Sequence, residues 1–266
     1  DTLIENNFST FVYTGNGSTR TITNGIDLSN KGGLVWTKCR SDSVGHELVD
    51  TVRGAEKYLE SHSNNQEQTS TGVVNGFTSS GYTMLGTGGG VNDNNKTYVS
   101  WTFKKASKFF DVVTYTGTGS ARTISHSIGD TVGMIIVKNL SQSDSWAVYH
   151  RGMDDSAPQN YDMHIDTNAA RSDDTTWNDT APTSSVFSVG TSHMVNADGE
   201  NYVAYLFAHN TGADSMIKCD KFTGSSGEMS VDLGFEPQFV MIKNRQSADN
   251  WIIGDTMRGY FASGVD

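Results

Sequence analysis

The chain has 266 residues and a formal net charge of −11, because 30 Asp and Glu outnumber 19 Lys and Arg. These charges are spread along the sequence, which excludes the basic face that a nucleic-acid binder needs to replace the counterions around phosphates. No apolar stretch reaches the roughly 20 residues that span a bilayer, so membrane insertion is not expected. The 28 glycines and only three prolines suit short strands joined by tight turns.

The first seven residues are predicted to be a linker, since they have neither the basic nor the apolar region of a signal peptide. Two cysteines in the whole chain are too few for a disulfide framework. Cys39 and Cys219 fall at different places in the repeat described next, so both are predicted to be free thiols.

The sequence repeats itself with a period of about 100 residues. Residues 37–54 align without a gap with residues 242–259, and Tyr-Thr-Gly at residue 13 recurs at residue 115 and as Phe-Thr-Gly at residue 222. Self-similarity of this kind identifies the folding unit. We expect a first repeat at 8–107, a second at 108–213 and an incomplete third at 214–266.

Each repeat opens with a strand-like run, a glycine-containing turn and a second alternating run, which predicts a hairpin. A continuous apolar run that ends on a lysine follows, and predicts a buried strand. After a polar loop come a tryptophan-containing strand (first repeat excepted) and an Arg-Gly turn. The second repeat is two residues shorter between that lysine and that arginine and lacks the aspartate of the other two.

The back of each complete repeat is predicted to be a second hairpin, because residues 81–92 align with residues 185–196 and each segment leads into an alternating return strand. About six short strands in about 100 residues predict an all-β fold of tandem β-sandwiches, jelly-roll or lectin-like. The strongest helix candidate, residues 53–61, is at most two turns long. The third copy ends before its back hairpin; we expect the natural chain to continue, the alternative being completion by a neighbour.

Several charged and aromatic positions recur between repeats and are expected to brace the fold rather than to bind a ligand. Asp50 with Arg53, and Asp255 with Arg258, are expected to form salt bridges that fix a turn. Catalytic sites are rarely copied along a repeat array, whereas structural features are copied by necessity. The recurring positions are Lys38, Asp50, Arg53, Lys138, Trp146, Arg151, Lys243, Trp251, Asp255 and Arg258.

One loop of the second repeat is a candidate ligand site. Trp177 lies there beside Asp173, Asp174, Asn178 and Asp179, and an aromatic platform next to carboxylates and amides suits sugar binding. The equally weighted alternative is a tryptophan that folds back and covers its own loop.

No catalytic set and no metal-binding spacing stands out. The seven histidines have neither paired-histidine spacing nor a cysteine partner motif. Acidic loops at residues 154–155, 173–174 and 198–200 carry calcium-type ligands without EF-hand spacing, and aspartate is also the ordinary turn residue. No cofactor and no enzymatic activity is expected.

Taken together, these motifs resemble a repeat family of marine bacteriophage virion proteins. The pattern is Tyr-Thr-Gly-x-Gly, an apolar strand to a lysine, a tryptophan, Asp-Thr-x-Arg-Gly, Val-Asn and Tyr-Val-Ala-Tyr or Trp. It is carried by residues 13–17, 38, 50–54, 91–92 and 98–101, by residues 115–119, 138, 146, 151–152, 195–196 and 202–205, and by residues 222–227 and 243–259.

The resemblance implies a phage structural or tail-fibre-like protein on the exterior of the virion, tail or capsid, and hence extracellular. The leading hypothesis is a tail-fibre or tail-associated adhesin that touches host surface glycan, with weak contacts multiplied by repeats and copies. Other virion proteins are the expected partners, and a homotrimer is plausible for a fibre. The alternatives are a capsid decoration or horn protein that acts as a spacer, and a polysaccharide depolymerase, for which no carboxylate pair is found.

Overall fold

The computed structural model describes residues 3–86, 90–212 and 214–259. Parts of the predicted linker, back hairpin and third repeat therefore lie outside the described residues. The fold is all-β, built from antiparallel sheets, as the sequence predicts. Among the described residues the one α-helix, α1 (His193–Asn196), has four residues. Residues 53–61, the strongest helix candidate in the sequence, form turns and a short strand instead. Within the described part of the chain no helix is both long and apolar enough to cross a membrane.

The chain enters through a 3₁₀ turn, η1 (Ile4–Asn6), and its first unit then forms β1 (Phe8–Thr14), β2 (Arg20–Thr23), β3 (Gly33–Cys39), β4 (His46–Asp50), β5 (Lys57–Tyr58), β6 (Gln68–Thr69), β7 (Val74–Thr78), β8 (Gly81–Met84) and β9 (Thr97–Lys104). The second unit forms β10 (Phe110–Thr116), β11 (Arg122–Ser125), β12 (Val132–Asn139), β13 (Ala147–His150), η2 (Pro158–Asn160), β14 (Tyr161–His164), β15 (Ser172–Asp173), β16 (Val186–Val189), α1 and β17 (Asn201–Ala208). The third contributes β18 (Phe239–Ile242), β19 (Ile252–Asp255) and η3 (Thr256–Arg258).

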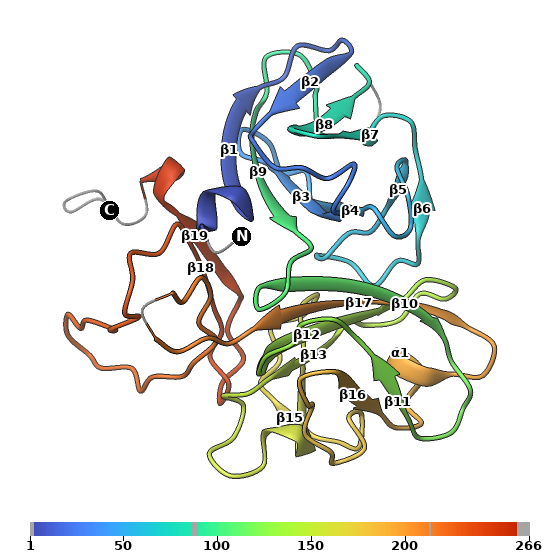
Figure 1. Ribbon diagram of the computed structural model, residues 1–266, viewed down its shortest axis with the longest axis vertical. Coiled ribbons are helices and arrows are strands. Elements are labelled where there is room, and N and C mark those ends of the chain that lie inside the picture. Colours follow the sequence, from blue (N-terminus) through green and yellow to red (C-terminus); the bar gives the residue numbers. More distant parts are fainter. Residues whose placement is uncertain (1–2, 87–89, 213, 260–266) are drawn as a thin grey trace.

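The first two units share one strand order (Figure 1). The main sheet runs β1-β9-β3-β4 in the first unit and β10-β17-β12-β13 in the second, where β14 and β15 extend it. A smaller sheet, β2-β8-β7 or β11-β16, covers one face of each main sheet. Each unit is therefore a sandwich with a core of its own.

The two hairpins predicted in each repeat are wrong. β1 pairs with β9 while β2 pairs with β8, so the opening run crosses from one sheet to the other. β8 and β9 also lie in different sheets. Alternation identifies a strand but not its partner, and here the glycine turn carries the chain across the sandwich so that both sheets share one core.

A glycine is required where the opening loop meets the loop before the return strand. A Cβ on Gly15 would lie 2.1 Å from the carbonyl oxygen of Asp93, and one on Gly117 would lie 2.0 Å from that of Ala197. Any side chain there would push the two loops apart. In the first two units the glycine of Tyr-Thr-Gly is therefore required because the backbones touch, whereas a Cβ on Gly224 of the third unit would meet nothing within 4 Å.

The asparagine of Val-Asn clamps the same two loops. Asn92 Nδ2 donates to the Ser18 carbonyl at 2.7 Å, and Asn196 Nδ2 donates to the Ser120 carbonyl at 2.7 Å. Tyrosines flank the clamp: Tyr13 stacks on Tyr98 with ring centroids 5.1 Å apart, and its hydroxyl donates to the Val91 carbonyl at 2.7 Å. Tyr115 repeats both contacts in the second unit. These motif residues hold each sandwich closed.

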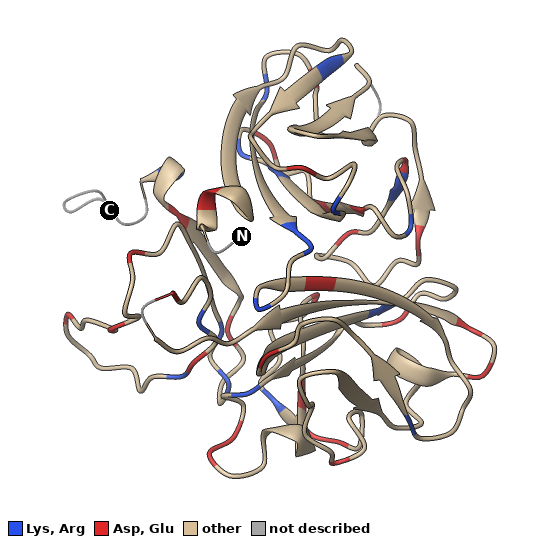
Figure 2. Cartoon of the chain, in the orientation of Figure 1, with Lys and Arg blue, Asp and Glu red and all other residues tan. Residues whose placement is uncertain are grey.

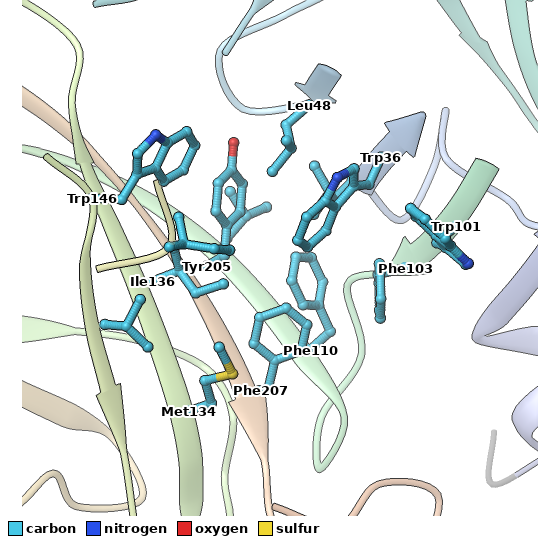
Figure 3. Packing of buried hydrophobic residues seen from close by; sticks show 14 of the residues in the cluster. Trp36, Leu48, Trp101, Phe103, Phe110, Met134, Ile136, Trp146, Tyr205 and Phe207 are labelled. Atoms are coloured by element: carbon cyan, nitrogen blue, oxygen red, sulfur yellow. The ribbon is translucent and has the colours of Figure 1, made fainter. Parts of the chain in front are cut away.

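The outer faces of the main sheets are buried as well, in one core shared between units (Figure 3). Return strands β9 and β17 supply alternating residues to it, and β18 and β19 of the third unit pack against it. Its largest fully buried side chains include Trp36, Trp101, Trp146, Tyr205 and Phe110. Both faces of each main sheet are thus apolar, which is why the central strands read as continuous apolar runs.

The predicted Asp–Arg salt bridges are confirmed. Arg53 Nε lies 2.5 Å from Asp50 Oδ2, and the equivalent Arg258 and Asp255 atoms are also 2.5 Å apart. The exposed fraction of the Arg53 side chain is 1%, against 25% for Arg258. The first pair is therefore sealed from water, whereas solvent reaches the second.

Each aspartate also receives a donor from another unit. The Tyr205 hydroxyl donates to Asp50 Oδ2 at 2.8 Å, and Trp101 Nε1 donates to Asp255 Oδ2 at 3.1 Å. Tyr205 and Trp101 occupy the same position in their return strands, opposite Ile136 and Trp36. The salt bridge therefore fixes a turn and also joins neighbouring units.

The second unit replaces this aspartate with a histidine. His150 pairs with Met134 as Asp50 pairs with Leu34, and His150 Nδ1 accepts from the Gly152 N–H at 3.0 Å. The two missing residues come from the turn, so Arg151 points elsewhere and donates to the Cys219 carbonyl at 3.3 Å.

The lysines that end the apolar strands all donate to the carbonyl of the next residue: the Nζ atoms of Lys38, Lys138 and Lys243 each lie 2.8 Å from that oxygen. Burial lowers the pKa of Lys138 to about 8. Both cysteines are free and buried, as predicted.

Replacing Arg53 by methionine is expected to destabilise the protein by about 3–5 kcal/mol, because Asp50 stays buried without its cation. Arg258→Met is the matched control and is expected to cost less, about 1–3 kcal/mol, since water replaces part of the lost contact. Urea unfolding measures both. A loss below about 1 kcal/mol for Arg53→Met would contradict this account of the buried pair.

Candidate functional site

A cavity of about 570 Å³ lies where the three units meet. We call it the junction cavity. The first unit supplies Trp36, His46, His62 and Trp101, the second supplies residues 165–168, and the third supplies Met241, Asn250, Trp251, Ile253 and Arg258. The first and third units reach the cavity with residues of β3, β9, β18 and β19, and the second unit reaches it with the loop that follows β14, so the same packing that joins the units creates it.

The wall from the first unit is aromatic. His46 Nδ1 accepts a hydrogen bond from Trp36 Nε1 at 2.9 Å, and the imidazole stacks on Trp101 with centroids 6.0 Å apart. Burial lowers the pKa of His46 to about 4, so the ring is neutral at pH 7. These rings present flat, uncharged surfaces, and the Lys38 ammonium, which donates to the Cys39 and Val44 carbonyls, lines the cavity beside them.

The wall from the third unit combines an indole with a cation. Trp251 Nε1 donates to the His164 carbonyl at 2.8 Å, which fixes the indole while leaving part of its ring accessible. The Arg258 guanidinium lies 5.2 Å from the Trp101 ring centroid. Polar groups of Asp166, Asn168 and Asn250 complete the lining.

This combination suits a polyhydroxylated ligand. Indole faces stack on the apolar side of a sugar ring, and amides and carboxylates bind its hydroxyls. Asp166 is the one acidic residue among the described lining residues, and its Oδ1 already accepts from the Trp146 N–H at 3.1 Å. The cavity therefore offers binding groups rather than the paired carboxylates of a glycosidase.

A second cavity, of about 430 Å³, lies between the first two units beside Arg53 and Lys57. Its charged groups are paired with one another: Arg53 and Lys57 lie 3.3 and 3.6 Å from Glu67 oxygens. No tryptophan appears among its described lining residues. The junction cavity is the stronger candidate for this reason.

The loop with Trp177 is not an aromatic platform. The exposed fraction of Trp177 is 1%, and its ring lies in the core of the second sandwich, edge-on to Tyr149 with centroids 6.0 Å apart. The sequence alternative in which this tryptophan folds back over its own loop is the correct one. Its ring is too large and apolar to remain in water when a core lies beneath it.

The polar residues predicted to accompany Trp177 remain at the surface. Asp173, Asp174, Asn178 and Asp179 are exposed, and the last two have left-handed backbone conformations with φ of 52° and 46°. Asn178 and Asp179 lie in the turn that contains the buried indole, whereas Asp173 ends β15. The structure does not bring them to the junction cavity.

Three of the acidic residues considered for calcium are engaged with protein groups. Asp154 lies 2.8 Å from Arg171 Nη1, and Asp155 pairs with Lys221 and Arg245. Glu200 accepts from Asn139 Nδ2. In residues 3–86, 90–212 and 214–259, no group of three His, Cys, Asp or Glu side chains is arranged to hold a metal ion.

Nearly the whole chain, residues 5–263, matches a family described as "Domain of unknown function (DUF7483)". The chain belongs to this family. Comparison with curated proteins and with solved structures gives no match. The DUF7483 domain therefore spans all three units.

Sequence reasoning missed the junction cavity. Trp251 was predicted as a repeat position, but His46, His62 and the residues at 165–168 carry no motif that marks them as neighbours. In the DUF7483 chain they meet only because the units pack around a common core, and no local spacing encodes that contact.

Glu47, next to His46 in β4, is expected to make the free energy of unfolding depend on pH. Its Oε2 is buried without a hydrogen-bond partner, and burial raises the pKa of Glu47 to about 8 from an ordinary value of 4.5. A raised folded-state pKa contributes stability below pH 4.5 that is lost as pH rises through 8. Glu47→Gln is therefore expected to match the wild type at pH 4 and to be on the order of 1–3 kcal/mol more stable above pH 8.

Urea unfolding at a series of pH values measures this difference. The exposed Glu228→Gln is the control, and its stability is expected to parallel that of the wild type at every pH. Buried histidines lower acid stability equally in all three proteins, so they cancel from the comparison. A Glu47→Gln curve parallel to the wild type would show that this carboxylate is solvated.

Proposed function

We propose that this chain is a non-enzymatic structural module of a bacteriophage virion, with its units packed as one rigid body on the exterior of the particle. The observation that carries the proposal is the use of the repeated residues. The glycine, asparagine, tyrosine, lysine, aspartate and arginine of the motif each make a structural contact within or between units. A motif whose residues all make packing contacts suits a protein selected for shape and stability.

Charge distribution supports an exterior position. Figure 2 shows Lys and Arg interspersed with Asp and Glu along the described chain, whereas binding of packaged nucleic acid would require clustered basic residues. The net charge of −11 favours a particle surface that repels its neighbours and stays dispersed. The resemblance to marine phage virion proteins supports the same location.

Localisation on intact virions tests this proposal. Antibody raised against the chain is expected to label purified particles of the phage that encodes it, as seen by electron microscopy. Label at the tail favours the tail-fibre adhesin, and label on the shell favours the capsid decoration protein. Particles without label, and without the chain by mass spectrometry, would overturn the virion assignment.

The junction cavity supports glycan binding as a second candidate function. It joins partly exposed Trp251 to a neutral histidine and amide groups, which matches the chemistry of a saccharide site better than the Trp177 loop does. In a repeated, multi-copy fibre, weak binding at such a cavity would be multiplied into useful adhesion.

Saturation-transfer NMR with a panel of bacterial surface oligosaccharides tests this candidate. Trp251→Ala and Asn250→Ala are expected to weaken binding about tenfold, the loss of about 1.4 kcal/mol. Asn94→Ala, at an exposed turn of the first unit, is the control and is expected to bind normally. Equal binding by all variants would exclude the junction cavity, and sugar release would show that the chain is an enzyme.

A further inference from the structure

One edge of β18 in the third unit has no neighbouring strand among the described residues, whereas the equivalent edges of β3 and β12 in the other two units are paired. β3 lies between β4 and β9, and β12 lies between β13 and β17. Among the described residues, β18 pairs with β19 alone. Since Phe239 pairs with Asp255 as Leu34 pairs with Asp50, the open edge of β18 corresponds to the edge of β3 that binds β9.

The backbone groups on that edge can be assigned. The Thr256 N–H donates to the Gln238 carbonyl, so residues 238, 240 and 242 face β19. Phe239 and Met241 therefore direct their N–H and C=O groups to the open side. Their counterparts Leu34 and Trp36 bond to β9 at Phe103 and Trp101.

Among the described residues the third unit has no strand that corresponds to β9 or β17, and this accounts for the irregular conformation at its start. In the first unit β9 holds β1, and in the second unit β17 holds β10. The matching segment, residues 216–222, has no strand. Phe222 in this segment is 48% exposed. One strand placed between 216–222 and β18 would order the segment and cover this apolar surface.

The contacts between units point to the same gap. Trp101 on β9 reaches the aspartate of the third unit, and Tyr205 on β17 reaches the aspartate of the first. By the same geometry a return strand on β18 would direct its aromatic residue to the second unit, where His150 holds the aspartate position. That third contact is the missing member of a ring of three.

We propose that the open edge of β18 is a strand-acceptor site, and that its occupant is a β-strand of the return-strand type, which pairs with β18 as β9 pairs with β3. Alternate residues of the donor strand lie on one face, and that face carries one small or β-branched residue followed by two aromatic residues, like Val99, Trp101 and Phe103 of β9. Backbone hydrogen bonds supply affinity and the alternate side chains supply specificity. This inference does not depend on a virion location.

A synthetic peptide with the sequence of residues 96–105, KTYVSWTFKK, is the probe, and its lysines keep it soluble. It is expected to bind the full chain, raise the urea midpoint and protect the amides of Phe239 and Met241 from hydrogen exchange. A peptide with the same composition but with its alternation scrambled is expected not to bind.

N-methylated peptides identify the edge. In β9 the N–H groups of Trp101 and Phe103 face β3, whereas those of Ser100 and Thr102 face β1. N-methylation at the Trp101 and Phe103 positions is expected to weaken binding at least tenfold. N-methylation at the Ser100 and Thr102 positions is expected to weaken it less, because 216–222 forms the looser side.

Three outcomes would overturn the proposal. They are no binding at millimolar peptide, equal binding by both N-methylated peptides, and protection of β18 by concentration-dependent dimerisation without any peptide. The last would make a second copy of the chain the occupant. None of these outcomes bears on antibody labelling of virions, so failure of this proposal and failure of the proposed function are distinguishable.

Discussion

Burial of both faces of the main sheets is the constraint on which this structure depends. One face of each sheet packs on the smaller sheet of its own unit, and the other packs on the neighbouring unit. Because the second face has no cover inside its own repeat, a single repeat would leave Trp36, Trp101 and Phe103 in water. The repeats therefore stabilise one another, and we expect them to fold together rather than as independent domains.

Polar contacts give this apolar packing its register. A shared core of aromatic and aliphatic side chains tolerates sliding of one unit against another. The Tyr205 hydroxyl, in contrast, donates to Asp50 and accepts from Arg53 Nη2, and both bonds form at one relative position only. The buried charges contribute little net stability when intact, yet they are costly to separate. Their repetition at Asp255 and Arg258, with Trp101 as donor, indicates that orientation between units is what the motif specifies.

The second unit shows how much variation this scheme accepts. His150 takes the aspartate position and bonds the shortened turn through Nδ1, and Arg151 contacts the backbone of the third unit instead. The neighbouring unit places no return strand against this position in the described residues. A buried carboxylate needs donors, and the shortened turn no longer places an arginine beside this position, so a neutral imidazole that accepts one backbone N–H fits it.

Sequence alone determined the all-β class, the repeated unit, the free cysteines and the Asp–Arg pairs, because alternation and a three-residue spacing are local properties of the chain. Tertiary structure alone decided which strands pair, that Trp177 lies in a core, and that His46, Trp251 and the residues at 165–168 surround one cavity. These contacts join positions far apart in sequence, and they depend on which faces are buried together rather than on any pattern within a segment.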